Sequence, residues 1–263
     1  MGLPVIAPTI ILGVNDTFEL AGFYERSYSQ DPERAALFSR WRALSAVGKA
    51  DHVISLCAAA SLAPASVLDV GCGDGALLSE LHRRGFGGVM AGVEITQAAV
   101  DIAAQREEIG AVSLYDGRNL PFAPGAFELG VLSHVLEHVT EPAALLAEVA
   151  RVCGAVVCEV PLEANWSARR GDRRAIAAEV GHLQRLSRAG ARRIVADAGL
   201  QLAAELEDPL PAEVHRFFAG SARQRAAGTA KWALRNSLHT LAPPLARRSF
   251  TLHYACLALA PGA

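Results

Sequence analysis

Long apolar runs are missing from this chain of 263 residues, and so are common targeting signals. No segment approaches the roughly 20 consecutive apolar residues needed to cross a bilayer. Residues 5–12 are apolar, but Pro8 interrupts them and no basic residue precedes them, so they do not fit a secretory signal. Ile6 stands where N-myristoylation would require Ser or Thr. We expect a cytoplasmic protein without a transmembrane segment.

Closely spaced cysteine pairs are also missing, since the five cysteines form no Cys-x-x-Cys motif. Free cysteines in or beside strands behave as small apolar side chains. We therefore expect reduced thiols, as in a cytosolic protein, at all five positions: Cys57, Cys72, Cys153, Cys158 and Cys256.

Acidic residues are absent from Val214 onward, where the chain carries seven Lys or Arg. The net charge of the whole chain is nevertheless −2, which gives no reason to expect a nucleic-acid partner. The chain is 51% apolar and 20% charged, which excludes a disordered protein and predicts one large α/β domain with additions.

Residues 66–78 read Ser-Val-Leu-Asp-Val-Gly-Cys-Gly-Asp-Gly-Ala-Leu-Leu. A short apolar run with β-branched residues precedes Gly71, Gly73 and Gly75, and a helical apolar pattern follows, so the order predicts strand, tight turn and helix. Glycines let the backbone turn sharply and let a ligand approach main-chain N–H groups. The stretch predicts a site for a nucleotide-like molecule.

Asp69 helps to choose between two such ligands. Gly71-x-Gly73-x-x-Ala76 also fits the dinucleotide fingerprint, so an NAD-dependent oxidoreductase stays open. An anion two residues before the turn would repel a pyrophosphate, whereas it would pair with the ammonium group of S-adenosylmethionine.

These residues resemble the glycine-rich first motif of class I S-adenosylmethionine-dependent methyltransferases, and the resemblance continues to Leu259. It implies S-adenosyl-L-methionine as cofactor. The residues expected to bind it at the first motif are Asp69, Gly71, Cys72, Gly73 and Gly75.

The next two strand ends extend the resemblance. Glu94 ends the predicted second strand about 20 residues after the glycines, where a carboxylate can accept both ribose hydroxyls, and Ile95 would pack on the adenine. The third strand ends at Asp116-Gly117-Arg118, which is similar to a family segment whose Asp accepts a hydrogen bond from the adenine amino group. We expect these residues to bind the cofactor too.

Residues 133–139 follow the predicted fourth strand and resemble the family's His-Val-Leu-Glu-His-Val segment. The resemblance implies that the backbone near Ser133 lines the cofactor and that the following residues face the transferable methyl group. His182 lies in a turn similar to the family's Gly-His-x-x-x-(Phe/Leu)-Ser, whose His points into the acceptor pocket. An imidazole is partly neutral at cellular pH, so we take His138 and His182 as the leading candidates for catalytic proton transfer and His134 as the third.

A metal site is the alternative for the same residues. His134-x-x-Glu137-His138 resembles the Glu-x-x-Glu-His arrangement of metal-assisted O-methyltransferases, in which residues at i, i+3 and i+4 share one helix face. His182 could then complete a set of four ligands. The chain departs from that pattern because His134 stands where a carboxylate is expected. We assign no metal, and substrate positioning and structural hydrogen bonding stay open for these side chains.

Residues 1–63 predict an arm and a helical cap, with helices at 32–47 and 49–61. Asp31 and Pro32 suit the N-cap and the first helical position. In the family such helices fold over cofactor and acceptor. Candidates for contacts to the cofactor carboxylate or the acceptor are Tyr24, Tyr28, Trp41 and Lys49.

The fold predicted for residues 64–263 is a doubly wound, seven-stranded Rossmann-like methyltransferase sheet, with strand six at 200–206 and strand seven at 250–259. The resemblance implies that this last strand is antiparallel. A helical insertion at 210–248 carries an apolar stripe and a parallel cationic one. The stripes predict a lid that buries the leucines over the acceptor or, alternatively, a helix on an anionic membrane surface. Their residues are Leu234, Leu238 and Leu241, and Lys231, Arg235 and His239.

The predicted function is methyl transfer from S-adenosylmethionine to a small molecule, such as a secondary metabolite, a sugar or a lipid-like acceptor, with O-methylation of a hydroxyl favoured. An anionic acceptor is suggested by four arginines in the loop at 162–181, although a solvated helix face would explain them equally: Arg169, Arg170, Arg173 and Arg174. Two further functions stay open, a tRNA or RNA methyltransferase that uses the basic C-terminal tract and a catalytically silent cofactor-binding partner of another enzyme. The oligomeric state is not predicted.

Overall fold

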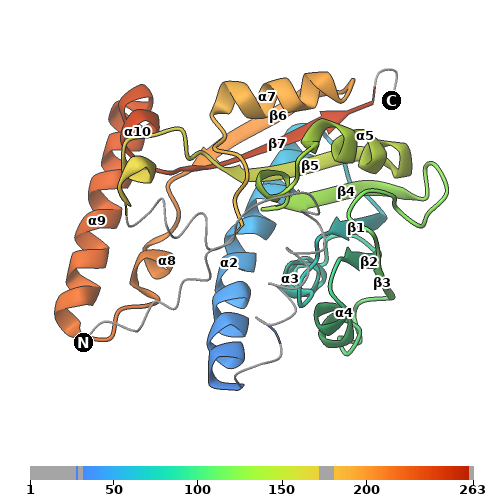
Figure 1. Ribbon diagram of the computed structural model, residues 1–263, viewed down its shortest axis with the longest axis horizontal. Helices are drawn as coiled ribbons and strands as arrows, with labels where there is room; N and C mark the ends of the chain where they lie inside the picture. Colours follow the sequence, from blue (N-terminus) through green and yellow to red (C-terminus); the bar gives the residue numbers. More distant parts are fainter. Residues whose placement is uncertain (1–27, 29–31, 172–180, 261–263) are drawn as a thin grey trace.

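A seven-stranded sheet with the order β3-β2-β1-β4-β5-β7-β6 forms the centre of the computed structural model, which describes residues 28, 32–171 and 181–260 (Figure 1). The strands β1 to β5 pair in parallel, and β7 is antiparallel to both β5 and β6. This confirms the predicted doubly wound sheet with its antiparallel last strand. The strands are β1 Ser66–Val70, β2 Val89–Glu94, β3 Ala111–Leu114, β4 Phe127–Ser133, β5 Cys153–Pro161, β6 Gln201–Asp208 and β7 His253–Leu259.

Helices connect the strands in the alternation that the sequence predicts. They are α2 Pro32–Ala59, α3 Ala76–Arg83, α4 Gln97–Ala103, α5 Pro142–Val152, α7 Arg188–Asp197, α8 Ala212–Arg216, α9 Ala222–Leu241 and α10 Pro243–Ser249, with 3-10 turns η1 Leu136–His138 and η2 Ser167–Arg169. The Ser187 side chain accepts a hydrogen bond from the backbone N–H of Gly190 and caps α7.

The N-terminal cap is one helix, α2, and the prediction of two helices with a break at residue 48 was wrong. A glycine inside a helix costs only about 1 kcal/mol. On either side of Gly48, Ala46, Ala50, Val53 and Leu56 recur at helical spacing and are buried, so one apolar face runs through the glycine and holds the helix together.

Two apolar clusters cover the two faces of the sheet. On one face, side chains of α5 and α7 such as Leu146, Val149 and Ile194 pack on strand residues. On the other face, α2, α3 and α4 provide the cover, with residues such as Leu56 and Leu78. Figure 1 shows α5 and α7 together on one side of the sheet, with α2 and α3 on the other. The sheet is therefore buried on both faces, which explains its apolar strands.

The insertion between β6 and β7 folds into α8, α9 and α10, which Figure 1 shows at the β6 and β7 end of the molecule. Several polar side chains of α9 and α10 face the sheet. Arg235 is buried and donates a hydrogen bond to the carbonyl of Thr251, and Arg247 and His239 both approach the carboxylate of Glu207 on β6. These side chains hold the insertion against β6 and the segment before β7.

The expectation that the leucine stripe would be covered was wrong for two of its three members. Leu234 is 60% exposed and Leu241 is 84% exposed, while Leu238 packs against the core. The buried Arg235 likewise does not belong to an exposed cationic row. No helix within the described ranges is long and apolar enough to cross a membrane.

All five cysteines are buried and free of disulfides, as expected for apolar filler. Cys158 on β5 and Cys256 on β7 face each other with their sulfur atoms 3.3 Å apart, in a thiol hydrogen bond.

Candidate functional site

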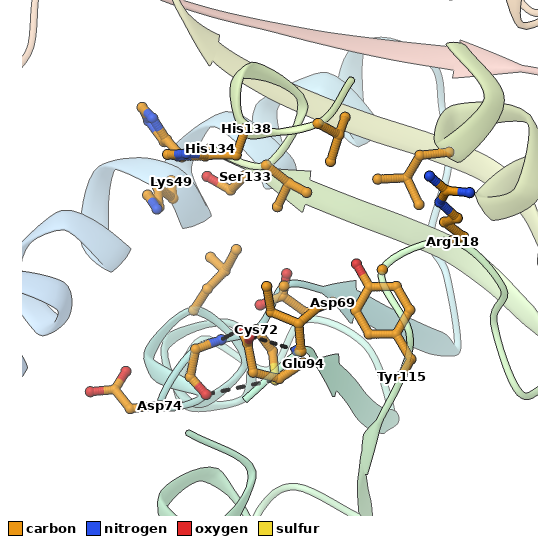
Figure 2. Close-up of a pocket in the computed structure, with 18 of the residues that line it drawn as sticks. Lys49, Asp69, Cys72, Asp74, Glu94, Tyr115, Arg118, Ser133, His134 and His138 are labelled. Carbon is orange, nitrogen blue, oxygen red and sulfur yellow. Dashed lines mark hydrogen bonds between the residues drawn. The ribbon is translucent and has the colours of Figure 1, made fainter. Parts of the chain in front are cut away.

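A cavity of about 970 Å³ opens at the carboxyl ends of the central parallel strands. Most of the predicted cofactor-binding residues line it: Asp69, Gly71, Cys72, Gly73, Glu94, Ile95, Gly117, Arg118 and Ser133. Figure 2 shows Cys72, Asp74 and Glu94 on one side of the cavity and Lys49, Ser133, His134 and His138 on the other. We call these the glycine side and the histidine side.

The glycine turn between β1 and α3 forms the floor of the glycine side. Gly71, Gly73 and Gly75 all have positive φ, a conformation that other residues adopt only with strain. The backbone N–H of Gly71 donates to the carbonyl of Val93 at 2.8 Å, which holds the turn against β2. A Cβ on Gly71 would lie 2.7 Å from Val135, so no larger residue fits.

Gly75 does not line the cavity but shapes the turn. It is the N-cap of α3, and a Cβ there would lie 2.5 Å from the side chain of Ile109. Its contribution is therefore to the path of the backbone rather than to the lining.

Asp69 lies at the carboxyl-end half of β1 and is 3% exposed. Burial raises the pKa of its carboxyl to about 7, against the opposing charge of Lys49. Lys49 on α2 lines the same cavity, and no ion pair within 4 Å joins it to another described residue. An acid and an amine thus face one cavity, an arrangement that suits a ligand carrying both an ammonium and a carboxylate.

Glu94 is already engaged in the glycine turn. Its two carboxylate oxygens accept hydrogen bonds from the backbone N–H groups of Gly73, at 3.0 Å, and Ile95, at 2.6 Å. Glu94 is 8% exposed, so this strand tip is buried even without a ligand. Burial raises the pKa of Glu94, against the backbone donors that favour its anion. Each oxygen retains a lone pair for a hydroxyl donor.

The Asp116 side chain does not line the cavity. It is exposed, and its carboxylate accepts from the backbone N–H groups of Arg118, at 2.8 Å, and Asn119, at 2.6 Å. These hydrogen bonds lower its pKa. Asp116 shapes the turn whose Gly117 and Arg118 reach the cavity, and its contact with adenine stays a prediction.

The helix α2 covers the cavity as the cap was expected to do. Trp41 and Lys49 line it together with Tyr28, and Arg42 donates to the buried Asp74 at 2.8 Å. The Arg42 guanidinium also lies over the Tyr28 ring, 4.6 Å from its centroid. Tyr24 lies outside the described residues.

The insertion reaches this site only indirectly. None of the described residues from 210 to 248 lines the cavity. Phe217 and Phe218 instead pack against the ring of Trp41, with centroids 5.2 Å and 5.1 Å apart. A closing role for the insertion stays a prediction, and it would act through Trp41.

The three predicted catalytic histidines fall into two clusters. The single helix face that the metal alternative expects for His134, Glu137 and His138 is not formed. His134 follows β4 with a φ of 61°, ahead of the 3-10 turn η1 that carries Glu137 and His138. One cluster joins His134 to Glu159 and His253, and the other joins His138 to Glu137 and His182.

The second cluster places His138 at the cavity wall with His182 behind it. His138 lines the cavity, whereas His182 does not. Their rings are 4.8 Å apart in an edge-to-face arrangement, and His182 Nδ1 lies 2.9 Å from a carboxylate oxygen of Glu163. A row of three neighbouring side chains thus runs from the loop after β5 to the cavity: Glu163, His182 and His138.

Of the loop arginines, Arg169 and Arg170 are exposed and absent from the cavity lining, and Arg173 and Arg174 lie outside the described residues. The cations that do line the cavity come from elsewhere: Arg42, Lys49, Arg118 and Arg151.

Three ionisable residues near the site were missed by the sequence analysis: His52, Glu159 and His253. Glu159 is the one acid in the otherwise apolar strand β5, and His253 opens β7. An ionisable residue inside a buried strand is itself unusual and can mark a site. That signal was present in the sequence.

The glycine turn, the acidic strand ends and the sheet order together define the class I S-adenosylmethionine-dependent methyltransferases. The profile of a family described as "Methyltransferase domain" matches residues 39–205, and the chain belongs to this family. S-adenosylmethionine is the cofactor of the class.

Among individual proteins, a ubiquinone biosynthesis O-methyltransferase from Thiobacillus denitrificans is 32% identical over 105 residues, which cover 35% of this chain and 41% of that protein. The match thus spans less than half the length of this relative.

Two solved structures share the fold over nearly their whole length. The geranyl diphosphate C-methyltransferase of Streptomyces coelicolor A3(2), in complex with Mg²⁺, geranyl diphosphate and S-adenosyl-L-homocysteine, has a TM-score of 0.62 at 16% identity and covers 97% of this chain and 99% of its own. A Thermotoga maritima S-adenosylmethionine-dependent methyltransferase has a TM-score of 0.59 at 12% identity, covering 91% and 99%.

Proposed function

We propose that the protein transfers a methyl group from S-adenosylmethionine to a hydroxyl oxygen of a small acceptor, with His138 as the general base. The observation that carries this proposal is the position of His138, which lines the cavity while its Nδ1 is held 3.1 Å from the carbonyl oxygen of Gly181.

A carbonyl oxygen only accepts hydrogen bonds, so His138 Nδ1 must carry the hydrogen. In the neutral ring the lone pair is then on Nε2, the atom that can take a proton from an acceptor hydroxyl. Burial lowers the pKa of His138. The ring is therefore neutral at pH 7 and able to act as a base.

His182 and His134 have different parts in this proposal. His182 is a positioning residue that stands behind His138 and is oriented by Glu163. Burial and Lys49 favour neutral His134, but hydrogen bonds to Glu137 and Glu159 raise its pKa above the ordinary value. A histidine that holds its proton is a poor base, so His134 is the weakest catalytic candidate of the three.

Residues from both sides of the cavity fit the cofactor. Asp69 suits its ammonium group, Lys49 its carboxylate, and Glu94 its ribose hydroxyls. Bound there, the cofactor supplies a methyl group already activated on a sulfonium. The chain has to align the acceptor oxygen with that methyl group, exclude water and take up the hydroxyl proton.

A small acceptor is favoured over nucleic acid. The basic tract after Val214 would have to hold phosphates, yet Arg216, Arg235 and Arg247 are engaged with Glu213, the Thr251 carbonyl and Glu207. The cavity of about 970 Å³ is of the size that holds small molecules. The partial match to an O-methyltransferase supports oxygen as the methylated atom.

The test is methyl transfer from labelled cofactor to a small-molecule extract of the source organism, followed by mass spectrometry of the labelled product. We expect an O-methylated product with the parent protein and almost none with His138→Gln, while both bind S-adenosylhomocysteine equally in calorimetry. A product methylated by His138→Gln at the parental rate would overturn the assignment of the base.

A further inference from the structure

We propose that His134, His253 and Glu159 form a binding site for one divalent transition-metal ion, Zn²⁺ being the best fit, in the wall of the cavity. Its three ligands differ from the Glu137, His138 and His182 cluster, which it contacts only through Glu137, and the proposal does not depend on the proposed methyl transfer.

The three candidate ligand atoms are spaced as an ion would require. Glu159 Oε1 lies 2.9 Å from His253 Nδ1 and 3.3 Å from His134 Nε2, and the two ring nitrogens are 3.2 Å apart. A tetrahedral ion with bonds of about 2.0–2.1 Å holds its ligand atoms roughly 3.3 Å apart. The three atoms thus already approximate one face of a tetrahedron.

Rigid elements supply all three ligands. Glu159 is in β5, His134 directly follows β4 and His253 begins β7, three strands that are neighbours in the sheet. The backbone N–H of His134 donates to the carbonyl of Glu159 at 2.9 Å, which fixes two of the ligands relative to each other. A site on packed strands needs little ordering when an ion binds.

An outer layer of partners orients the ligands. The second nitrogen of His134, Nδ1, lies 3.0 Å from the buried carboxylate of Glu137. The second oxygen of Glu159, Oε2, lies 3.1 Å from His52 Nδ1, and His52 Nε2 lies 3.1 Å from Asp208. Carboxylate–histidine pairs of this kind fix the tautomer of metal-binding imidazoles and raise their basicity.

The donor set indicates the kind of ion. Two imidazole nitrogens and one carboxylate oxygen suit Zn²⁺ or Fe²⁺, whereas Mg²⁺ and Ca²⁺ prefer oxygen ligands. His134 and His253 both line the cavity, while Glu159 is 3% exposed. The fourth position therefore faces the cavity, where a water or an oxygen of a small molecule would complete the coordination.

Lys49 is a nearby group that opposes a cation. It lines the same cavity, and its charge contributes to lowering the pKa of His253, after burial and His134. Replacing this ammonium with an uncharged chain, as in Lys49→Met, should tighten metal binding measured without cofactor. If the three side chains only hydrogen-bond to one another, neither the parent protein nor Lys49→Met should bind an ion.

The experiment uses the full chain freed of metal by a chelator. We expect calorimetry to show one Zn²⁺ per chain, Mg²⁺ to bind far more weakly, and Co²⁺ to give the intense visible absorption of a four- or five-coordinate site. Loss of a residue that hydrogen-bonds to a metal ligand lowers metal affinity by about 10- to 100-fold. His253→Ala and His134→Ala each remove a ligand itself, so we expect each to weaken Zn²⁺ binding by at least that factor. Circular dichroism checks that each variant folds.

Two histidine variants are the controls. His82→Ala, on the exposed face of α3, should bind Zn²⁺ like the parent. If His182→Ala loses the ion while His253→Ala keeps it, the ion belongs to the other cluster and this proposal is wrong. It is also wrong if no ion binds. Should the ligand variants not fold, anomalous scattering from a zinc-soaked parent crystal decides, by a peak at the three atoms or none.

Discussion

The glycine side and the histidine side of the cavity are built in different ways. The glycine side comes from short, contiguous segments, chiefly β1 with its turn and the end of β2, held by backbone hydrogen bonds such as that from Gly71 to Val93. The histidine side joins α2, β4, β5 and β7, and it includes contacts between side chains far apart in the sequence, such as that between His253 and Glu159. One side is a local motif and the other a tertiary assembly. The two should respond differently to mutation.

The largest expected effect separates turnover from cofactor binding. His138→Ala should lower kcat by about 10²- to 10⁴-fold, the range for loss of a general base. Affinity for S-adenosylhomocysteine should stay within error, because His138 lies on the opposite side of the cavity from Glu94. His82→Ala is the matched control. Equal loss of binding and turnover in His138→Ala would show that the two sides are not separable.

Glu94→Ala tests the glycine side. Charge-assisted hydrogen bonds contribute on the order of 1.5–3 kcal/mol each, so cofactor affinity should fall roughly tenfold or more. Because Glu94 also accepts from Gly73 and Ile95, the free energy of unfolding without cofactor should fall by about 1–3 kcal/mol. Glu107→Ala, an exposed acid after α4, is the control for chemical denaturation. Unchanged affinity would contradict the ribose contact.

We expect Asp69 to make cofactor binding depend on pH. With its pKa raised to about 7 by burial, Asp69 is largely protonated below pH 7 in the free protein. A ligand ammonium pairs with the anion, so binding releases this proton and affinity falls as pH drops below about 7, by up to about tenfold per unit. Calorimetry in two buffers of different ionisation enthalpy measures the proton release. Asp69→Asn should bind weakly with no such dependence; a sloping Asp69→Asn profile would assign the proton elsewhere.

The smallest expected effect concerns the insertion. Phe217→Ala removes one ring from Trp41, and aromatic pairs contribute about 0.5–1.5 kcal/mol beyond their buried area. We expect KM for the acceptor to rise several-fold with kcat little changed. Leu241→Ala, at an 84% exposed position, should leave both constants alone. If Phe217→Ala has no effect, the insertion acts only as a cover for the sheet edge.

The difference between the glycine side and the histidine side also explains which features could be predicted from the sequence. The alternation of strands and helices and the glycine turn follow from local pattern, since Gly71 and Gly73 have positive φ in the turn. The antiparallel last strand was expected from the resemblance to the methyltransferase family, and the sheet order was not predicted. The contact between His134 and His253 could not be predicted from the sequence, because it forms only when β7 pairs with β5 in the sheet. Periodicity did predict a helix within the insertion, but not that Arg235 would be buried and Leu234 exposed.

Strand β7 is made after β6 and yet lies between β5 and β6 in the sheet. During synthesis, therefore, β6 has nothing to hydrogen-bond with until the insertion has been translated and β7 has emerged from the ribosome. The parallel strands and the glycine turn can form while translation continues, since N-terminal parts fold first. His253 arrives last, so a nascent chain would acquire its nucleotide-binding half well before its histidine cluster is complete.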